Sequence, residues 1–89
     1  MSPGGTVAED FVMSSGLRSR LLGHLARNPM TVTELASVES KHLSHVSRAL
    51  SELRSQGLVE PVSRIARERK YRVTHEGLAL YATFLKNAR

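Results

Sequence analysis

The first strong helical pattern covers residues 17–27, where leucines recur at intervals of three and four residues. Such spacing gathers apolar side chains on one face of a helix, so an amphipathic helix that packs into a core is predicted. Asn28 and Pro29 end it, because proline lacks an amide hydrogen and disfavours helical dihedral angles in the residue before it. The apolar positions of this helix are Leu17, Leu21, Leu22 and Leu25.

A weaker apolar stripe at helical spacing precedes it in residues 7–13, and residues 14–16 interrupt that stripe. A short or kinked first helix is therefore predicted there. Residues 1–6 contain one proline and two glycines and offer little to bury, which predicts a flexible tail. We expect one domain over residues 7–89, with residues 1–6 outside it.

Two helices joined by a tight turn are predicted after a brief extended piece. Thr31 and Glu34 fit a capping box, in which each side chain satisfies the other residue's free backbone amide, so a helix should begin after Thr31. Ser40 is expected to cap a longer helix over residues 41–56, and Gly57 is expected to end that helix in a left-handed conformation. The apolar stripe of the longer helix is Leu43, Val46, Leu50 and Leu53.

After this helix the periodicity changes to the alternation of β-strands. One extended segment opens at Leu58 and a second contains Tyr71 and Val73, which predicts a hairpin with its loop near residues 65–68. Pro61 cannot donate a hydrogen bond to a β-ladder, so the first strand is expected to lie at an edge of the sheet.

The last predicted helix, which Thr74 caps, carries two apolar stripes. One stripe is assigned to the core, and the other, on a different side of the helix, is assigned to a partner surface. The core stripe is Leu78, Tyr81, Ala82 and Leu85, and the other stripe is Leu80 and Phe84. The predicted fold class is a mainly helical α+β domain with a three-helix core, a β-hairpin and a C-terminal helix.

Composition narrows the class of protein. A chain of 89 residues, of which 40% are hydrophobic and 24% charged, suits one folded core. The absence of cysteine excludes disulfides and thiolate metal ligands. No apolar run reaches the length of a membrane span and no leader pattern opens the chain, so a cytoplasmic protein is expected. Phosphate-binding loops, metalloprotease motifs and nucleophile elbows are absent from the sequence, so neither enzymatic activity nor a cofactor is expected.

Charge points to a polyanionic partner, because the net charge is +5 and two segments are rich in hydrogen-bond donors. The outward face of the helix over residues 41–56 suits a DNA major groove, where arginine can pair with guanine. The hairpin holds five basic residues against one acid, which suits phosphates and the minor groove. The helix candidates are Lys41, Ser44, His45, Arg48 and Ser51, and the hairpin candidates are Arg64, Arg67, Arg69 and Lys70, followed by Arg72.

The order helix, short strand, helix, turn, helix, hairpin, helix resembles the winged helix-turn-helix regulators of the ArsR and MarR type. The segment LSHVSRALSELRSQGLVE, residues 43–60, is similar to the recognition helix of archaeal members. FVMSSGLRSRLLGHL and KYRVTHEGLALY look like the first helix and the junction between the last strand and the last helix. The resemblance implies a transcriptional regulator that binds double-stranded DNA sequence-specifically. It places Ser44, His45, Ser47 and Arg48 against the DNA.

A homodimer is predicted, with its two recognition helices in successive major grooves about 34 Å apart. Its interface is assigned to the apolar residues of the terminal helices that are left over once the core is assigned. These residues are Val7, Phe11, Leu80 and Phe84.

Two other functions are open from the sequence alone. The domain could dock on protein or RNA in a larger complex, or it could bind DNA without sequence preference. His42 and His45 lie three residues apart on a helix and could share a metal, but without thiolates or an acid between them no metal site is assigned.

Overall fold

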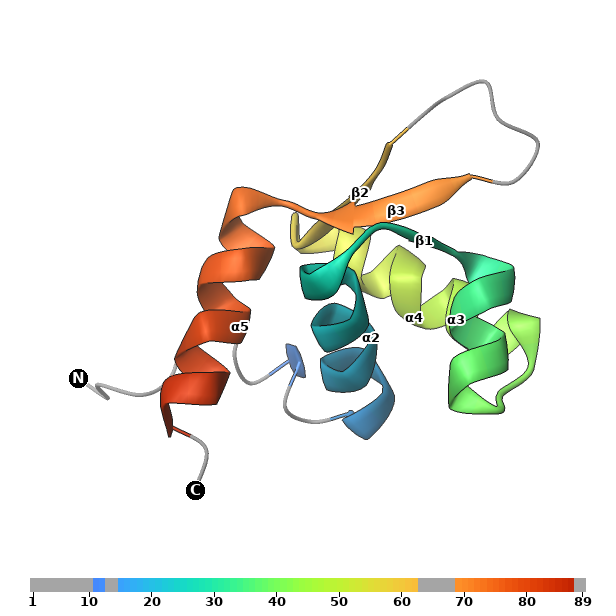
Figure 1. Cartoon of the computed structure of the whole chain (residues 1–89), viewed down its shortest axis with the longest axis horizontal. Coiled ribbons are helices and arrows are strands. Elements are labelled where there is room, and N and C mark those ends of the chain that lie inside the picture. Colours follow the sequence, from blue (N-terminus) through green and yellow to red (C-terminus); the bar gives the residue numbers. More distant parts are fainter. Residues whose placement is uncertain (1–10, 13–14, 63–68, 88–89) are drawn as a thin grey trace.

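The computed structural model describes residues 11–12, 15–62 and 69–87 of the chain (Figure 1). The helices are α2 (Gly16–Arg27), α3 (Val32–Glu39), α4 (Leu43–Ser55) and α5 (His75–Asn87). The strands are β1 (Met30–Thr31), β2 (Val59–Pro61) and β3 (Lys70–Val73). The predicted mainly helical α+β fold is confirmed. Phe11 and Val12 are helical, while the rest of the predicted first helix and the tail at residues 1–6 lie outside the described residues.

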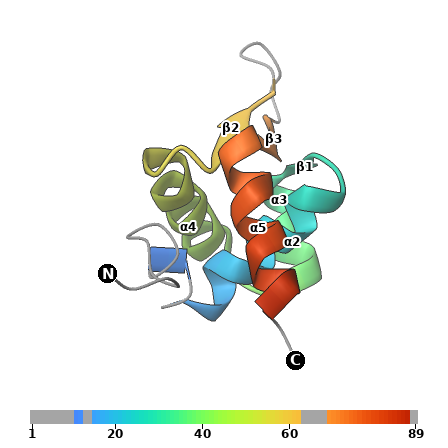
Figure 2. The same cartoon turned by 90° about the vertical axis from the view of Figure 1, so that its left-hand side faces the viewer.

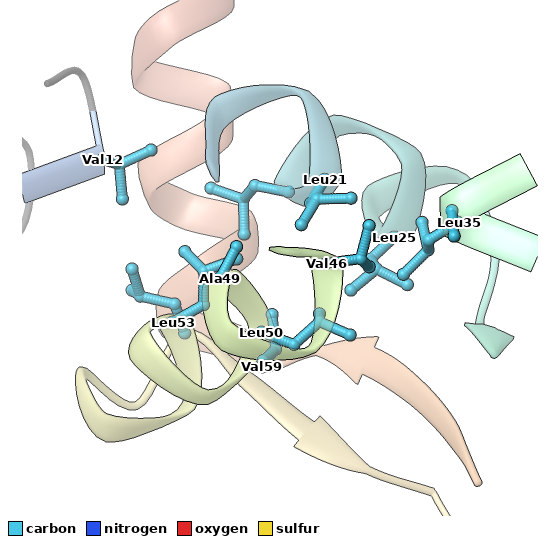
Figure 3. Close-up of a cluster of buried hydrophobic side chains, with 12 residues drawn as sticks. Val12, Leu21, Leu25, Leu35, Val46, Ala49, Leu50, Leu53 and Val59 are labelled. Carbon is cyan, nitrogen blue, oxygen red and sulfur yellow. The ribbon is translucent and has the colours of Figure 1, made fainter. Parts of the chain in front are cut away.

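The core forms where α2 crosses α4, with α3 and the sheet closing its sides (Figure 3). The leucines on the facing sides of these two helices, Leu21, Leu22, Leu25, Leu50 and Leu53, are 0–2% exposed. Burying one such side chain stabilises the fold by about 1.5–3 kcal/mol. The buried apolar residues are Val12, Leu21, Leu22, Leu25, Leu35, Ala36, Val46, Ala49, Leu50, Leu53, Leu58 and Val59. No helix in the described part of the chain is long and apolar enough to cross a membrane.

The capping box at the start of α3 is confirmed. The backbone N–H of Glu34 donates to Thr31 Oγ1 at 3.0 Å, and the backbone N–H of Thr31 donates to Glu34 Oε1 at 2.9 Å. Both amides are otherwise left without a partner at a helix start, so the pair fixes where α3 begins. Since Thr31 also belongs to β1, the cap ties the helix to the sheet.

The predicted cap of the next helix is wrong. Ser40 does not precede α4 as its cap but ends α3, in a left-handed conformation with φ 52°. Its backbone N–H donates to the last carbonyls of α3. The helix α4 begins two residues later than expected, after His42, so Lys41 lies in the turn and not on the helix. Leu43, predicted to be in the core, is 53% exposed because it occupies the first position of α4, beyond the reach of the core.

A three-stranded antiparallel sheet, in the order β1-β3-β2, packs against the helices α2, α3, α4 and α5. Tyr71 of β3 pairs with Met30 of β1 on one side and with Pro61 of β2 on the other. The edge position predicted for the strand with Pro61 is therefore confirmed. Gly57, which has φ 74°, confirms the left-handed end of α4 and turns the chain into β2.

The last helix packs with a different face from the one predicted. Leu80 and Phe84 lie against the core, and so does Tyr81. The core positions predicted for Leu78, Ala82 and Leu85 are wrong, because all three side chains are exposed, Leu78 to 48% and Leu85 to 60%. Either apolar stripe of α5 could pack against a core. The stripe with Leu80 and Phe84 does so because the first turn of α5 lies close to the backbone at Leu58.

Candidate nucleic-acid interface

One side of α4 presents polar side chains to solvent along its whole length. Val46, Ala49, Leu50 and Leu53 are buried, and the residues on the opposite side are exposed. Within the described part of the chain, the exposed serines at 44, 47 and 51 make no hydrogen bond through their side chains. Donors in this state can bind another molecule without losing an internal partner. The predicted candidates Ser44, His45, Ser47, Arg48 and Ser51 all lie here, and Lys41 lies exposed in the preceding turn.

Arg48 is the most central cation on this face, and its side chain is 83% exposed. Its Nε lies 3.7 Å from Oε2 of Glu52, one turn later on the same helix. At this distance the guanidinium and the carboxylate form a solvent-exposed ion pair, but they are too far apart for a hydrogen bond. The Glu52 carboxylate therefore attracts the Arg48 guanidinium without using its N–H donors. These donors can form two parallel hydrogen bonds with a base edge or a phosphate.

The hairpin, which follows α4 along the chain, holds further cations. Arg69 and Lys70, at the start of β3, are exposed. Arg72 is exposed too, although its Nε donates to Oε2 of Glu60 at 2.8 Å. The candidates Arg64 and Arg67 lie outside the described residues.

The structure places α4 and the hairpin next to each other. The chain leaves α4 at Gly57 and enters β2 directly, and α4 packs against β2. In Figure 1, β2 ends and β3 begins on the side of the molecule away from α5, where the turn between α3 and α4 also lies. Figure 2 shows α4 to one side of α5 and the strands above it, so α5 does not cover the outer side of α4.

A charged cluster joins α2 to α3 on another side of the domain. The Glu39 side chain, 9% exposed, accepts from Nε of Arg20 at 2.6 Å, and its other oxygen lies 2.7 Å from Nε2 of His24. Burial alone would raise the pKa of Glu39. The hydrogen bonds from Arg20 and His24 and the charges of these groups outweigh burial, so the pKa lies below its ordinary value of 4.5. The ionised carboxylate therefore holds the C-terminal end of α3 on α2.

A pH dependence follows from this cluster. Because the folded pKa of Glu39 lies below its unfolded value, the stabilisation is complete above pH 4.5 and is lost as the pH falls through the folded pKa. We expect Glu39→Gln to lower the free energy of unfolding near neutral pH by about 1–2 kcal/mol. In the variant this free energy should also decrease less as the pH is lowered. Urea denaturation across pH 2.5–7, which is roughly the range that glutamate titration covers, measures this. Glu60→Gln, which breaks an exposed pair, is the control, and an unchanged acid limb in Glu39→Gln would contradict the assignment.

His42 precedes α4 and His45 lies in its first turn, and no third metal-ligating side chain in the described part of the chain joins them. The rings of His42 and His45 meet edge to face, with centroids 5.8 Å apart. Among the residues that the structure describes, no group of three histidine, cysteine, aspartate or glutamate side chains could hold a metal ion.

Sequence reasoning missed one pair of side chains at this interface. Arg18 of α2 binds Glu52 of α4, the residue that faces Arg48. The spacing of four between Arg48 and Glu52 is visible in the sequence as a helical ion pair. The contact between Arg18 and Glu52 joins residues 34 positions apart, and no local pattern indicates it.

Comparison with protein families gives one match to this part of the chain. A family model described as a helix-turn-helix domain matches residues 13–62, which is more than half of the 89 residues. The match runs from before α2 to just after β2 and so includes α4. A comparison with curated protein sequences finds no match.

Solved structures with the same fold include one transcription regulator and the DNA-binding domain of a possible one. The homodimeric winged helix-turn-helix DNA-binding domain of a possible ArsR-family regulator from Mycobacterium bovis is 29% identical, with a TM-score of 0.78, and the match covers 91% of this chain and 75% of that one. MepR, a regulator of the Staphylococcus aureus multidrug efflux pump MepA, is 19% identical, with a TM-score of 0.75 and coverage of 89% and 63%.

A mutant of Lactococcus lactis ZitR is 18% identical, with a TM-score of 0.75 over 81% of this chain. The chain spans about half the length of that protein, 51%. At such low identity the likeness to ZitR and MepR concerns the fold alone.

Proposed function

The chain belongs to the helix-turn-helix domain family, and from that premise we propose that it is a transcriptional regulator that binds double-stranded DNA sequence-specifically. In this proposal α4 is the recognition helix and enters the major groove, while the β2–β3 hairpin lies on the minor groove and phosphates. The observation that carries the proposal is the outward face of α4. It is exposed, rich in donors and, at its serines, without hydrogen bonds to the described part of the chain.

Base reading is assigned to the middle of that face. Arg48 is the residue for a guanine, because its guanidinium can donate to O6 and N7 together. Ser44, Ser47, Ser51 and His45 can donate to or accept from neighbouring bases, and Lys41 in the preceding turn suits a phosphate. The exposed Leu43 adds an apolar side chain near the start of α4, which suits a thymine methyl group.

Affinity without sequence preference is assigned to the hairpin. Arg69 precedes β3 and Lys70 begins it, and both are exposed. They would neutralise phosphates, together with the arginines at 64 and 67. Each phosphate contact releases a counterion, so binding should weaken steeply as salt increases.

Selection of bound duplexes from a random pool tests the proposal. We expect one sequence motif to be enriched, and we expect the selected duplex to bind at least about 1000-fold more tightly than a scrambled duplex of the same composition. A salt titration of both duplexes then counts the phosphate contacts. Binding without enrichment would mean a sequence-independent DNA binder, and no binding at low salt would favour a protein or RNA partner instead.

We also infer that the protein acts as a homodimer, as the related Mycobacterium bovis domain does. Of the residues that the sequence assigns to the interface, Phe11, Leu80 and Phe84 pack partly buried against the protein's own core, and Val7 lies outside the described residues. The apolar stripe left exposed on α5 takes their place in the proposal. It consists of Leu78, Ala82 and Leu85, at spacings of four and three.

Sedimentation equilibrium tests the dimer directly. We expect the mass of two chains, about 20 kDa, at tens of micromolar protein, because each chain is 9.8 kDa. A single 9.8 kDa species at high micromolar concentration would contradict the proposal.

A further inference from the structure

The carboxylate of Glu52 is shared between two arginines of very different exposure. Its Oε1 accepts from Nε of Arg18 at 3.0 Å and from Nη2 of the same side chain at 2.8 Å. Its Oε2 lies 3.7 Å from Nε of Arg48. The Arg18 side chain is 18% exposed and that of Arg48 is 83% exposed. One oxygen is therefore fixed inside the domain, and the other faces the exposed arginine of the recognition helix.

Arg18 is itself held by the segment that precedes α2. Its Nη1 donates to the carbonyl oxygen of Phe11 at 2.8 Å, and its Cζ lies 3.9 Å from the centre of the Phe11 ring. Paired hydrogen bonds to a carboxylate and stacking on a ring both fix the plane of a guanidinium. With Arg18 held in this way, the Glu52 side chain has little freedom to rotate towards Arg48 and close the distance.

We propose that Glu52 is a positioning residue for Arg48, oriented by Arg18 and Phe11. The fixed negative charge keeps the Arg48 guanidinium over the outward face of α4 in the free protein. The 3.7 Å separation leaves the guanidinium free to move onto a base, since no hydrogen bond has to break. The inference rests on the proposed function, because it assigns the control of base reading to a residue that does not itself touch the DNA.

Two effects of the Glu52 charge can be separated by measurement. A carboxylate close to the DNA-facing side repels phosphates and weakens binding to every sequence. Restraint of Arg48 before binding reduces the side-chain entropy lost on binding and favours the sequence that Arg48 reads. Glu52 should therefore lower affinity for all duplexes while raising the ratio of affinities between the selected and the scrambled duplex.

Glu52→Gln tests the proposal, because glutamine keeps the size and the acceptor for Arg18 but removes the charge. We expect the variant to bind the scrambled duplex more tightly than the wild type does. The ratio of affinities between the selected and the scrambled duplex should be about twofold lower per protomer, or about fourfold lower for a dimer, because each protomer loses one helical ion pair. Glu60→Gln is the matched control, since it removes a charge paired with Arg72 on the sheet, and it should leave the ratio unchanged. Thermal melting of each variant checks that it is folded at the temperature of the binding measurements.

A double-mutant cycle separates positioning from a general structural role. In an Arg48→Ala background, Glu52→Gln should no longer change the affinity ratio. An unchanged ratio in the single variant, or an equal change in the Arg48→Ala background, would overturn the positioning role while the proposed function stands. A wild-type protein that binds no duplex would overturn both.

A measurement on the free protein needs no DNA at all. The order parameter of the Arg48 Nε–H bond, from nitrogen-15 relaxation, should be higher in the wild type than in Glu52→Gln. Equal mobility of this bond in the two proteins would overturn the proposal even if DNA binding is confirmed.

Discussion

Replacing Gly77 by alanine is expected to lower the free energy of unfolding by about 3 kcal/mol or more, at the upper end for an overpacked site. A Cβ at this position would overlap the carbonyl oxygen of Leu58 and lie 3.0 Å from its carbonyl carbon. These atoms belong to the backbone and cannot rotate away. The same carbonyl accepts from the backbone N–H of Thr74 at 3.0 Å, and Thr74 Oγ1 donates to the carbonyl of Gly57 at 2.6 Å. To make room, α5 would have to move away from the start of β2 and lose these bonds.

Urea denaturation followed by circular dichroism measures the effect. Gly16→Ala is the matched control, because the same methyl group at the start of α2 meets no backbone atom and only the end of the half-exposed Arg20 side chain, at 3.0 Å from Nη1. Alanine is the better helix former, so this control should be neutral or slightly stabilising. Equal midpoints for the two variants would show that α5 does not approach the Leu58 backbone as closely as described.

Replacing Arg48 by alanine is expected to weaken binding of the selected duplex by about 1–3 kcal/mol per protomer, or about 5- to 150-fold. A dimer loses two such contacts, so its affinity should fall by roughly the square of that factor. The affinity for a scrambled duplex should change little, because the proposed partner of Arg48 is a base edge. For the same reason the salt dependence should stay close to that of the wild type.

Arg54→Ala provides the control for this loss of charge. Arg54 is exposed in the last turn of the same helix, and its removal should at most weaken all duplexes alike. Fluorescence anisotropy with both duplexes at two salt concentrations distinguishes the variants. If Arg48→Ala kept the preference for the selected duplex, α4 would not be the helix that reads the sequence.

Much of the fold was predictable because its signals are local. The leucine spacing of α2, the capping box at Thr31 and the left-handed Gly57 depend on neighbours within four residues. The exposed face of α4 was predictable for the same reason, since the positions of Val46 and Leu50 on the helix fix its opposite side.

The features that sequence reasoning missed depend on contacts between distant segments. Both stripes of α5 are apolar, and only the approach of Gly77 to the Leu58 backbone decides that Phe84 faces the core and Leu85 the solvent. Ser40 had two suitable roles, and the left-handed turn that it adopts leaves it as the end of α3. Residue-by-residue assignment of base contacts and the dimer interface stay predictions.

The position of β3 between two strands has a consequence for how this domain can diversify. Its register is fixed on one side by Met30 and Thr31 and on the other by residues 59–61. A change in the length of the connection between β2 and β3 therefore cannot shift β3 without also breaking its pairing with β1. Descendants of this sequence could lengthen, shorten or replace that connection while the helices stay in place, so new DNA contacts could evolve there at little risk to the fold.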